Sequence, residues 1–302
     1  WPKFSPFLQG SGLTFIVYSA RFSWGLQAGG TPQLFFFGVD LKKAKAGQGD
    51  EGTVEKVLTR RNLFYRQDEV RTKSFAANLD QVLILIAAEP EFSESQLARA
   101  LIAAEAQRIT PLIALNKSDL VEPFERAWAR LLPYRHMHYG VMPLSLRLST
   151  DTDRDHLLQR LAGKTTLVLG PSGAGKSTLI NLLVPGALAE TNEISQALNS
   201  GKHTTTSTHW YWMDAARTTA LIDSPGFQEF GLHHIAPMQL AACMPDIAEH
   251  ATACKFYNCT HLHEPGCGVL DAVKNGPSAC GISPSRYKIY SDLFEELSHT
   301  RY

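Results

Sequence analysis

A glycine-rich turn at residues 170–177 reads Gly170-Pro171-Ser172-Gly173-Ala174-Gly175-Lys176-Ser177 and matches the phosphate-binding pattern G-x-x-x-x-G-K-[ST] in full. The apolar run Thr165 to Leu169 precedes it, and a helical pattern from Lys176 to Leu183 follows it, which is the context that the pattern requires. Glycines let such a turn curl so that its N–H groups face a phosphate, and the dipole of the following helix adds positive potential. A glycine-rich turn that only begins a helix is the alternative.

A second motif, Asn116-Lys117-Ser118-Asp119, follows the apolar run Leu112 to Leu115 and matches N-K-x-D. The Asp119 carboxylate can accept two hydrogen bonds from the N1–H and the amine of guanine, whereas adenine offers no such donor pair. Lys117 can lay its aliphatic stem along the base, and Asn116 can tie this loop to the phosphate-binding turn. The motif favours GTP over ATP, which leaves an ATP-using enzyme as the weaker alternative; taken alone, the tetrapeptide would be an ordinary loop.

Two further segments complete a phosphate and magnesium site. Asp223-Ser224-Pro225-Gly226 matches D-x-x-G, in which Asp223 would hold Mg²⁺ through water and the Gly226 amide would sense the γ-phosphate. Between the phosphate turn and this motif lies Gly201-Lys202-His203-Thr204-Thr205-Thr206, where a threonine hydroxyl, assigned to Thr205, could complete the magnesium shell. A polar surface loop is the alternative for this segment.

The wider pattern predicts three domains. From Asp80 onward, apolar runs alternate with helical patterns, which indicates an α/β domain with a parallel sheet covered by helices. The preceding segment is rich in strand formers with glycine-rich breaks and resembles an OB-fold barrel, although only three convincing strands are visible. We therefore expect a β-barrel domain at 1–75, the nucleotide-binding domain at 76–235 and a helical, cysteine-bearing domain at 236–302.

The carboxyl-terminal segment carries a metal pattern, Cys254-x4-Cys259-x-His261-x5-Cys267. Three thiolates and one imidazole within fourteen residues are enough for a closed tetrahedral site, which favours structural Zn²⁺. His263 could replace His261 as the nitrogen ligand, and unligated buried cysteines are the alternative. Cys243 and Cys280 fall outside the spacing and are expected to be packing residues or free thiols.

The base motif precedes the phosphate motif, so the usual GTPase order is cyclically permuted. This order, with the motifs at 116–119, 170–178, 201–206 and 223–226, resembles the circularly permuted GTPases and, among them, the ribosome-small-subunit-dependent GTPase A family. The resemblance extends to Arg60-Arg61-Asn62 and to the cysteine cluster. It implies a GTP hydrolase that serves as an assembly or maturation factor of the small ribosomal subunit, with hydrolysis stimulated by that particle and coupled to release. It also ranks His261 above His263.

Hydrolysis is expected to be slow without a partner, because Phe227 stands where many GTPases carry a glutamine that orients water. His203 is the candidate to position water or act as base, a role that the resemblance implies; a solvent-exposed histidine is the alternative. Lys176 and Gly226 complete the expected catalytic set. The expected nucleotide-binding residues are Asn116, Lys117, Ser118, Asp119, Gly170, Pro171, Ser172, Gly173, Ala174, Gly175, Lys176, Ser177, Thr178 and Asp223, with Mg²⁺ at Ser177, Thr205 and Asp223.

The overall charge argues neither for nor against RNA, because 29 basic residues balance 29 acidic ones. Any RNA contact must come from a local patch, and basic side chains interleaved with Phe64 and Tyr65 provide one candidate. This mixture suits phosphate contact by the cations and base stacking by the two rings, with surface solubility as the alternative. Its members are Arg60, Arg61, Arg66, Arg71 and Lys73. No apolar run is long enough to span a membrane, so we expect a cytoplasmic protein, which we take to be a monomer. The resemblance implies the small subunit and its rRNA as partners. A GTP-dependent switch on another RNA or protein, and a nucleotide-binding module without turnover, remain as alternatives.

Overall fold

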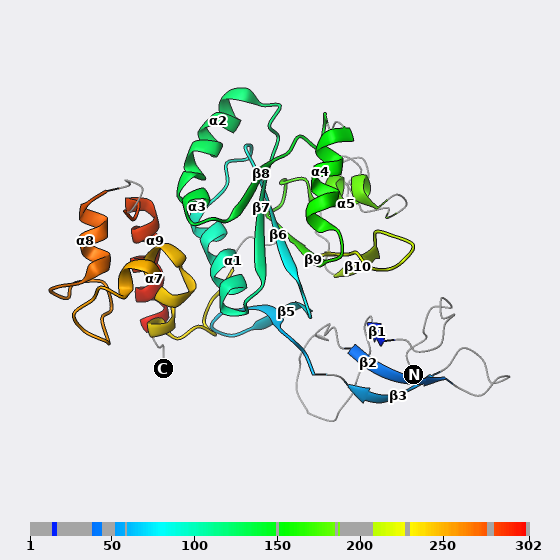
Figure 1. Ribbon diagram of the computed structural model, residues 1–302, viewed down its shortest axis with the longest axis horizontal. Coiled ribbons are helices and arrows are strands. Elements are labelled where there is room, and N and C mark those ends of the chain that lie inside the picture. The colour runs from blue at the N-terminus through cyan, green and yellow to red at the C-terminus, as the bar shows by residue number, and fades with distance from the viewer. Residues whose placement is uncertain are drawn as a thin grey trace.

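The computed structural model describes residues 14–16, 38–43, 52–57, 59–148, 151–184, 187, 208–226, 230–276 and 281–299. A central sheet with helices on both faces forms the body of the molecule (Figure 1). A small antiparallel sheet lies at its amino-terminal side, and a helical module at its carboxyl-terminal side (Figure 1).

The central sheet has six strands in the order β10-β11-β9-β6-β7-β8. Its parallel members pair in register, and only β10 runs antiparallel, against β11. All seven residues of β6 are buried, as expected for a strand covered on both faces. The strands are β6 (Gln81–Ala87), β7 (Thr110–Asn116), β8 (Gly140–Pro143), β9 (Thr165–Leu169), β10 (His209–Trp212) and β11 (Ala220–Asp223).

Two helical layers cover the sheet, and the strands divide their side chains between them (Figure 1). Val82, Ile84 and Ile86 of β6 point to one core, whereas Leu83 and Leu85 point to the other, because successive strand residues face opposite sides. The first core contains α1 (Glu94–Ala106), α2 (Val121–Arg130) and α3 (Leu132–His136), and the second contains α4 (Asp151–Leu161) and α5 (Lys176–Leu183).

The amino-terminal part contains two separate β units. β1 (Thr14–Ile16), β2 (Gly38–Lys43) and β3 (Gly52–Val57) form a three-stranded antiparallel sheet, so the complete OB-like barrel stays a prediction. β4 (Leu63–Gln67) and β5 (Thr72–Ala77) form a hairpin. Phe64 and Phe75 of this hairpin pack against Phe230, with ring centroids 5.7 and 5.9 Å away. Phe64 is fully buried, so the expectation that it stacks on RNA bases is wrong.

The carboxyl-terminal module packs against α1 and α3. The Arg286 guanidinium donates two hydrogen bonds of 2.8 Å to Asp246 and lies 5.2 Å from the centre of the Tyr134 ring. Arg99 of α1 pairs with Glu296, which adds a second link to this module. The module consists of η1 (Pro237–Gln239), η2 (Ala241–Cys243), α7 (Pro245–Ala251), α8 (Gly268–Lys274) and α9 (Pro284–Ser298). Within the described residues, no helix combines the length and the apolar character needed to cross a bilayer.

Candidate nucleotide site and metal centre

The phosphate-binding turn connects β9 to α5 at the carboxyl edge of the parallel strands, where open α/β sheets bind ligands. Gly175 precedes α5 with a φ of +102°, a left-handed conformation that a side chain would strain. A Cβ there would also lie 2.6 Å from Asn116 Nδ2. Lys176 Nζ donates to the carbonyl oxygen of Gly170 at 2.8 Å, so the ammonium lies over the turn. Glycine at 175 therefore allows the base loop to approach.

Asn116 joins the base motif to the phosphate turn. Its side chain is buried, and Nδ2 donates to the carbonyl oxygen of Ala174 at 2.9 Å. Its Oδ1 accepts from the Leu146 amide at 3.1 Å. The structure thus brings the segments around residues 116 and 175 together at one edge of one sheet, as a single nucleotide would require.

The segment after β8 belongs to the same site, although the sequence patterns did not single it out. Ser145 Oγ donates to Asp119 Oδ1 at 2.8 Å, which fixes the orientation of the carboxylate. The Ser118 amide donates to the Leu144 carbonyl at 3.0 Å and so holds the base loop in line with β8. The one available signal was that Ser145 ends the run Val141 to Ser145, one of the apolar runs after Asp80, and the structure places the corresponding strand, β8, directly beside β7.

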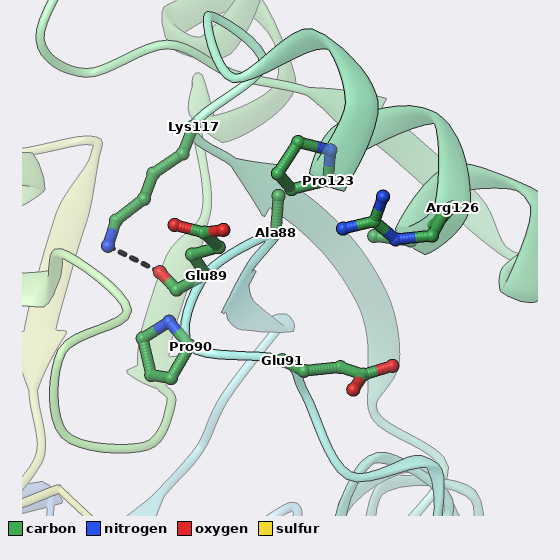
Figure 2. Close-up of a pocket in the computed structure, with 8 residues that line it drawn as sticks. Ala88, Glu89, Pro90, Glu91, Lys117, Pro123 and Arg126 are labelled. Carbon is green, nitrogen blue, oxygen red and sulfur yellow. Dashed lines mark hydrogen bonds between the residues drawn. The ribbon is translucent and has the colours of Figure 1, made fainter.

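Lys117 borders a cavity of about 550 Å³ beside the base loop (Figure 2). Its ammonium donates to the carbonyl oxygen of Glu89, in the segment that links β6 to α1 (Figure 2). Pro90 of the same segment lies 3.5 Å from where a Cβ on Gly173 would stand, so this segment contacts both loops of the site. The other cavity walls come from residues 88–91 and from Pro123, Arg126 and Ala127 of α2. That Lys117 stacks along a base stays a prediction.

Asp223 and Gly226 lie at the phosphate end of the site. Burial raises the pKa of Asp223, while Lys176 and His209 oppose that shift. Its Oδ1 is buried and has no hydrogen-bond partner among the described residues, which fits the expectation that this carboxylate would hold a hydrated Mg²⁺. A Cβ on Gly226 would lie 3.2 Å from Lys176 Nζ, so the D-x-x-G turn contacts the phosphate turn.

The remaining predicted residues lie in the first turn of α5 or outside the described part of the chain. Ser177 is half-buried and Thr178 is exposed at the start of α5. His203, Thr205 and Phe227 lie outside the described residues. His209, which the sequence patterns did not single out, lies opposite Asp223 in the β10–β11 ladder.

The cysteine pattern forms a compact cluster. One ligand atom from each of Cys254, Cys259, His261 and Cys267 lies within 4.8 Å of all the others. His261 Nδ1 is 3.3 Å from Cys254 Sγ and 3.5 Å from Cys267 Sγ, whereas His263 is exposed. Burial raises the pKa of the Cys259 thiol to about 12, and a divalent cation would offset the cost of burying its thiolate. The donor set therefore fits Zn²⁺. Cys243 is a half-buried free thiol, and Cys280 lies outside the described residues.

The family model described as RsgA GTPase matches residues 57–233. The chain belongs to the RsgA GTPase family. Membership confirms the resemblance seen in the motifs, the α/β fold with permuted motif order, and the assignment as a GTP-hydrolysing enzyme.

Curated relatives and solved structures agree with RsgA membership. The Small ribosomal subunit biogenesis GTPase RsgA of Variovorax paradoxus (strain S110) is 77% identical over 253 residues, covering 84% of this chain and 80% of that protein. Its counterpart in Paraburkholderia xenovorans (strain LB400) is 51% identical over 252 residues, covering 82% and 78%. YjeQ from Thermotoga maritima matches with a TM-score of 0.69 at 27% identity, covering 90% of this chain and 86% of that one. YloQ, described as a circularly permuted GTPase, matches with a TM-score of 0.65 at 27% identity, covering 93% and 85%.

The basic residues expected to contact RNA differ in how far their side chains are exposed in this RsgA-family chain. Arg61 is clamped by hydrogen bonds of 2.9 Å to the Asn78 carbonyl and to Asp80, although its side chain remains 62% exposed. Arg60 and Arg71 are exposed, whereas Arg66 and Lys73 are half-buried. Burial, and then the charge of Arg66, lower the pKa of Lys73. Their contact with RNA stays a prediction.

Proposed function

We propose that this protein binds the small ribosomal subunit in its GTP form, hydrolyses GTP in response to the particle, and then leaves it. The proposal is supported by the named function of a relative that is 77% identical over most of both chains. The chain would consist of three functional parts: a β domain at 1–75, the GTPase domain at 76–235 and the zinc-binding module at 236–302. We infer that it acts in the cytoplasm as a monomer.

The hydrogen bond from Asn116 Nδ2 to the Ala174 carbonyl is the observation that carries the nucleotide assignment. It fixes the distance between a carboxylate suited to guanine, Asp119, and a turn suited to phosphates. A bound GTP would then lie across the carboxyl ends of β7, β6 and β9, because β6 lies between the other two strands. Lys176 would exchange its carbonyl partners for phosphate oxygens, and the turn amides would bind the phosphates.

Hydrolysis requires stabilisation of charge on the γ-phosphate and an oriented water. Mg²⁺, when bound, would neutralise charge on the β- and γ-phosphates, with Ser177, Thr205 and Asp223 as its protein-side partners. His203 would orient the attacking water, since Phe227 has no polar group for this purpose. Contact with the small subunit would bring His203 into position for this role and so raise the rate.

Structural Zn²⁺ would hold the carboxyl-terminal module together through Cys254, Cys259, His261 and Cys267. The module and the amino-terminal domain would supply contacts to rRNA, with Arg60, Arg61, Arg66, Arg71 and Lys73 on the amino-terminal side. The two non-ribosomal alternatives, a switch on another macromolecule and a module without turnover, predict no specific response to small subunits.

Phosphate release from GTP and ATP, measured with purified small subunits, large subunits or no particle, tests the proposal. We expect GTP-specific hydrolysis that only small subunits accelerate, and a loss of roughly a hundredfold or more in Lys176→Ala, which removes a phosphate contact. His203→Ala should lose the stimulated rate while still binding GTP. Lys274→Ala, on an exposed face of α8, is the matched control and should behave like the parent. Equal rates with every particle would contradict the ribosomal assignment.

A further inference from the structure

The loop between the first two cysteines of the metal cluster carries two exposed aromatic side chains. We call residues Lys255-Phe256-Tyr257-Asn258 the aromatic tip. Tyr257 is fully exposed, and Phe256 is 41% exposed. Within the described part of the chain, they are the only exposed large hydrophobic side chains that are adjacent in sequence. Two adjacent exposed aromatic side chains indicate a binding site more strongly than single exposed hydrophobic residues do.

The backbone of the aromatic tip is held in place on both sides. Cys254 and Cys259, which flank it, belong to the metal cluster. The Lys255 amide donates to the Gly266 carbonyl at 2.9 Å, and the Cys259 amide donates to the Phe256 carbonyl at 3.3 Å. Gly266 has a φ of +72°, and a Cβ there would lie 3.2 Å from the Cβ of Lys255, so the two segments cross closely. Binding through this segment therefore costs little backbone conformational entropy.

The chemistry of the aromatic tip favours unpaired nucleic-acid bases. Lys255 Nζ lies 5.6 Å from the centre of the Phe256 ring, which places a cation beside an aromatic face. The neighbouring acid, Glu264, accepts hydrogen bonds from both the amide and the hydroxyl of Thr260 within its own loop. Burial opposes the shift, but these hydrogen bonds hold the pKa of Glu264 well below its ordinary value. Its carboxylate is therefore engaged within its own loop. The Lys255 side chain is exposed and forms no ion pair with any described residue, so its ammonium is available to a phosphate.

If the partner were a hydrophobic pocket on a protein, further apolar side chains would be expected around the two rings of the aromatic tip. The aromatic tip instead begins and ends with exposed polar side chains, Lys255 and Asn258, and the preceding Thr252 is exposed as well. Aromatic rings next to cationic and amide groups are the combination on which single-stranded RNA bases stack. RNA is therefore the better match.

Building on the function proposed above, we propose that Phe256 and Tyr257 stack on unpaired rRNA bases of the small subunit, with Lys255 contacting an adjacent phosphate. The aromatic tip would then be a sequence-tolerant contact, because every base has an aromatic face and no hydrogen-bond readout is required.

The test measures the affinity of the protein, bound to a non-hydrolysable GTP analogue, for purified small subunits. We expect Tyr257→Ala to weaken binding roughly five- to a hundredfold, as loss of one base stack does, and Phe256→Ala to weaken it in the same direction. Tyr257→Phe and Tyr257→Trp keep an aromatic face and should bind like the parent. Met238→Ala, an exposed apolar residue in the same module, is the matched control.

Tyr257→Leu distinguishes RNA stacking from a contact with a ribosomal protein. Leucine keeps the apolar bulk but has no aromatic face, so it should weaken binding like alanine if the ring stacks on a base. Binding at the parent level would overturn the proposal in favour of an apolar protein pocket. Zinc content and Tm, measured for each variant, establish that the module is folded.

The outcomes separate this inference from the function on which it rests. If the parent protein fails to bind small subunits, the proposed function fails. If the parent binds and Tyr257→Ala binds equally well, the function stands and the aromatic-tip proposal is refuted.

Discussion

Replacing Asn116 by alanine should uncouple the base loop from the phosphate turn. The side chain is 4% exposed and bridges two backbone groups, the Ala174 carbonyl at 2.9 Å and the Leu146 amide at 3.1 Å. Alanine removes both hydrogen bonds and leaves both backbone groups without that partner. Because Ala174 belongs to the phosphate turn and Leu146 to the segment after β8, three loops lose their common link.

The magnitude follows from the two lost bonds. A buried hydrogen bond contributes about 0.5–1.5 kcal/mol net, and leaving a buried partner unsatisfied costs about 1–3 kcal/mol. Relaxation and entry of water recover part of the loss, so a total of about 2–3 kcal/mol is expected, which corresponds to roughly 30- to 150-fold in the Kd for nucleotide. GTP and GDP should be affected about equally, since neither bond involves the γ-phosphate.

Fluorescent GTP and GDP analogues provide the assay, with Asn275→Ala as the control because that asparagine is exposed. Asn116→Asp retains the acceptor for Leu146 but sets a buried carboxylate oxygen against the Ala174 carbonyl oxygen, so it should weaken nucleotide binding at least as much as Asn116→Ala. Parent-like affinity of Asn116→Ala for both nucleotides would refute the reasoning that this side chain couples the loops.

Three further predictions concern the carboxyl-terminal module. Cys267→Ser or His261→Ala should lose bound zinc and lower the Tm, whereas Cys243→Ser should keep the zinc content and the Tm of the parent. Equal zinc content by mass spectrometry in all three variants would contradict the assignment of the cluster as a zinc site. Arg286→Met should lower the free energy of unfolding by about 3–5 kcal/mol, because the Arg286 side chain is 2% exposed and its loss leaves the Asp246 carboxylate without its cation. Lys288→Met, in an exposed ion pair, should change that free energy by less than about 1 kcal/mol. Urea denaturation measures both variants, and similar values for the two would disprove the argument. The hydrogen bond from Arg99 lowers the pKa of Glu296, so the stability from this pair is present above the ordinary carboxyl pKa and is lost as pH falls through the lowered value. Glu296→Gln should therefore lose less stability than the parent as the pH falls through this range. Parallel profiles of unfolding free energy against pH for parent and variant would exclude this contribution.

The sequence by itself determined the chemistry of the nucleotide motifs and the strands that carry them. The expected runs at 112–115 and 165–169 lie within β7 and β9, and the expected helix at 176–183 has the same bounds as α5. Local patterns sufficed here because a buried parallel strand requires a continuous apolar run, and a phosphate turn requires glycines at fixed positions. The cysteine spacing likewise predicted the four metal-ligand residues that the structure brings together, because a tetrahedral zinc site within one short segment permits few spacings of its ligands.

Only the tertiary structure decided which distant groups meet. The roles of Ser145 and Leu146 depend on β8 lying beside β7, a pairing that no local pattern specifies. Phe64 was expected to contact RNA because it and Tyr65 are interleaved with a group of basic residues, yet it is buried against Phe75 and Phe230. The reason is physical: a motif fixes the type of side chain and its local backbone, whereas burial and contact depend on packing between segments far apart in the chain.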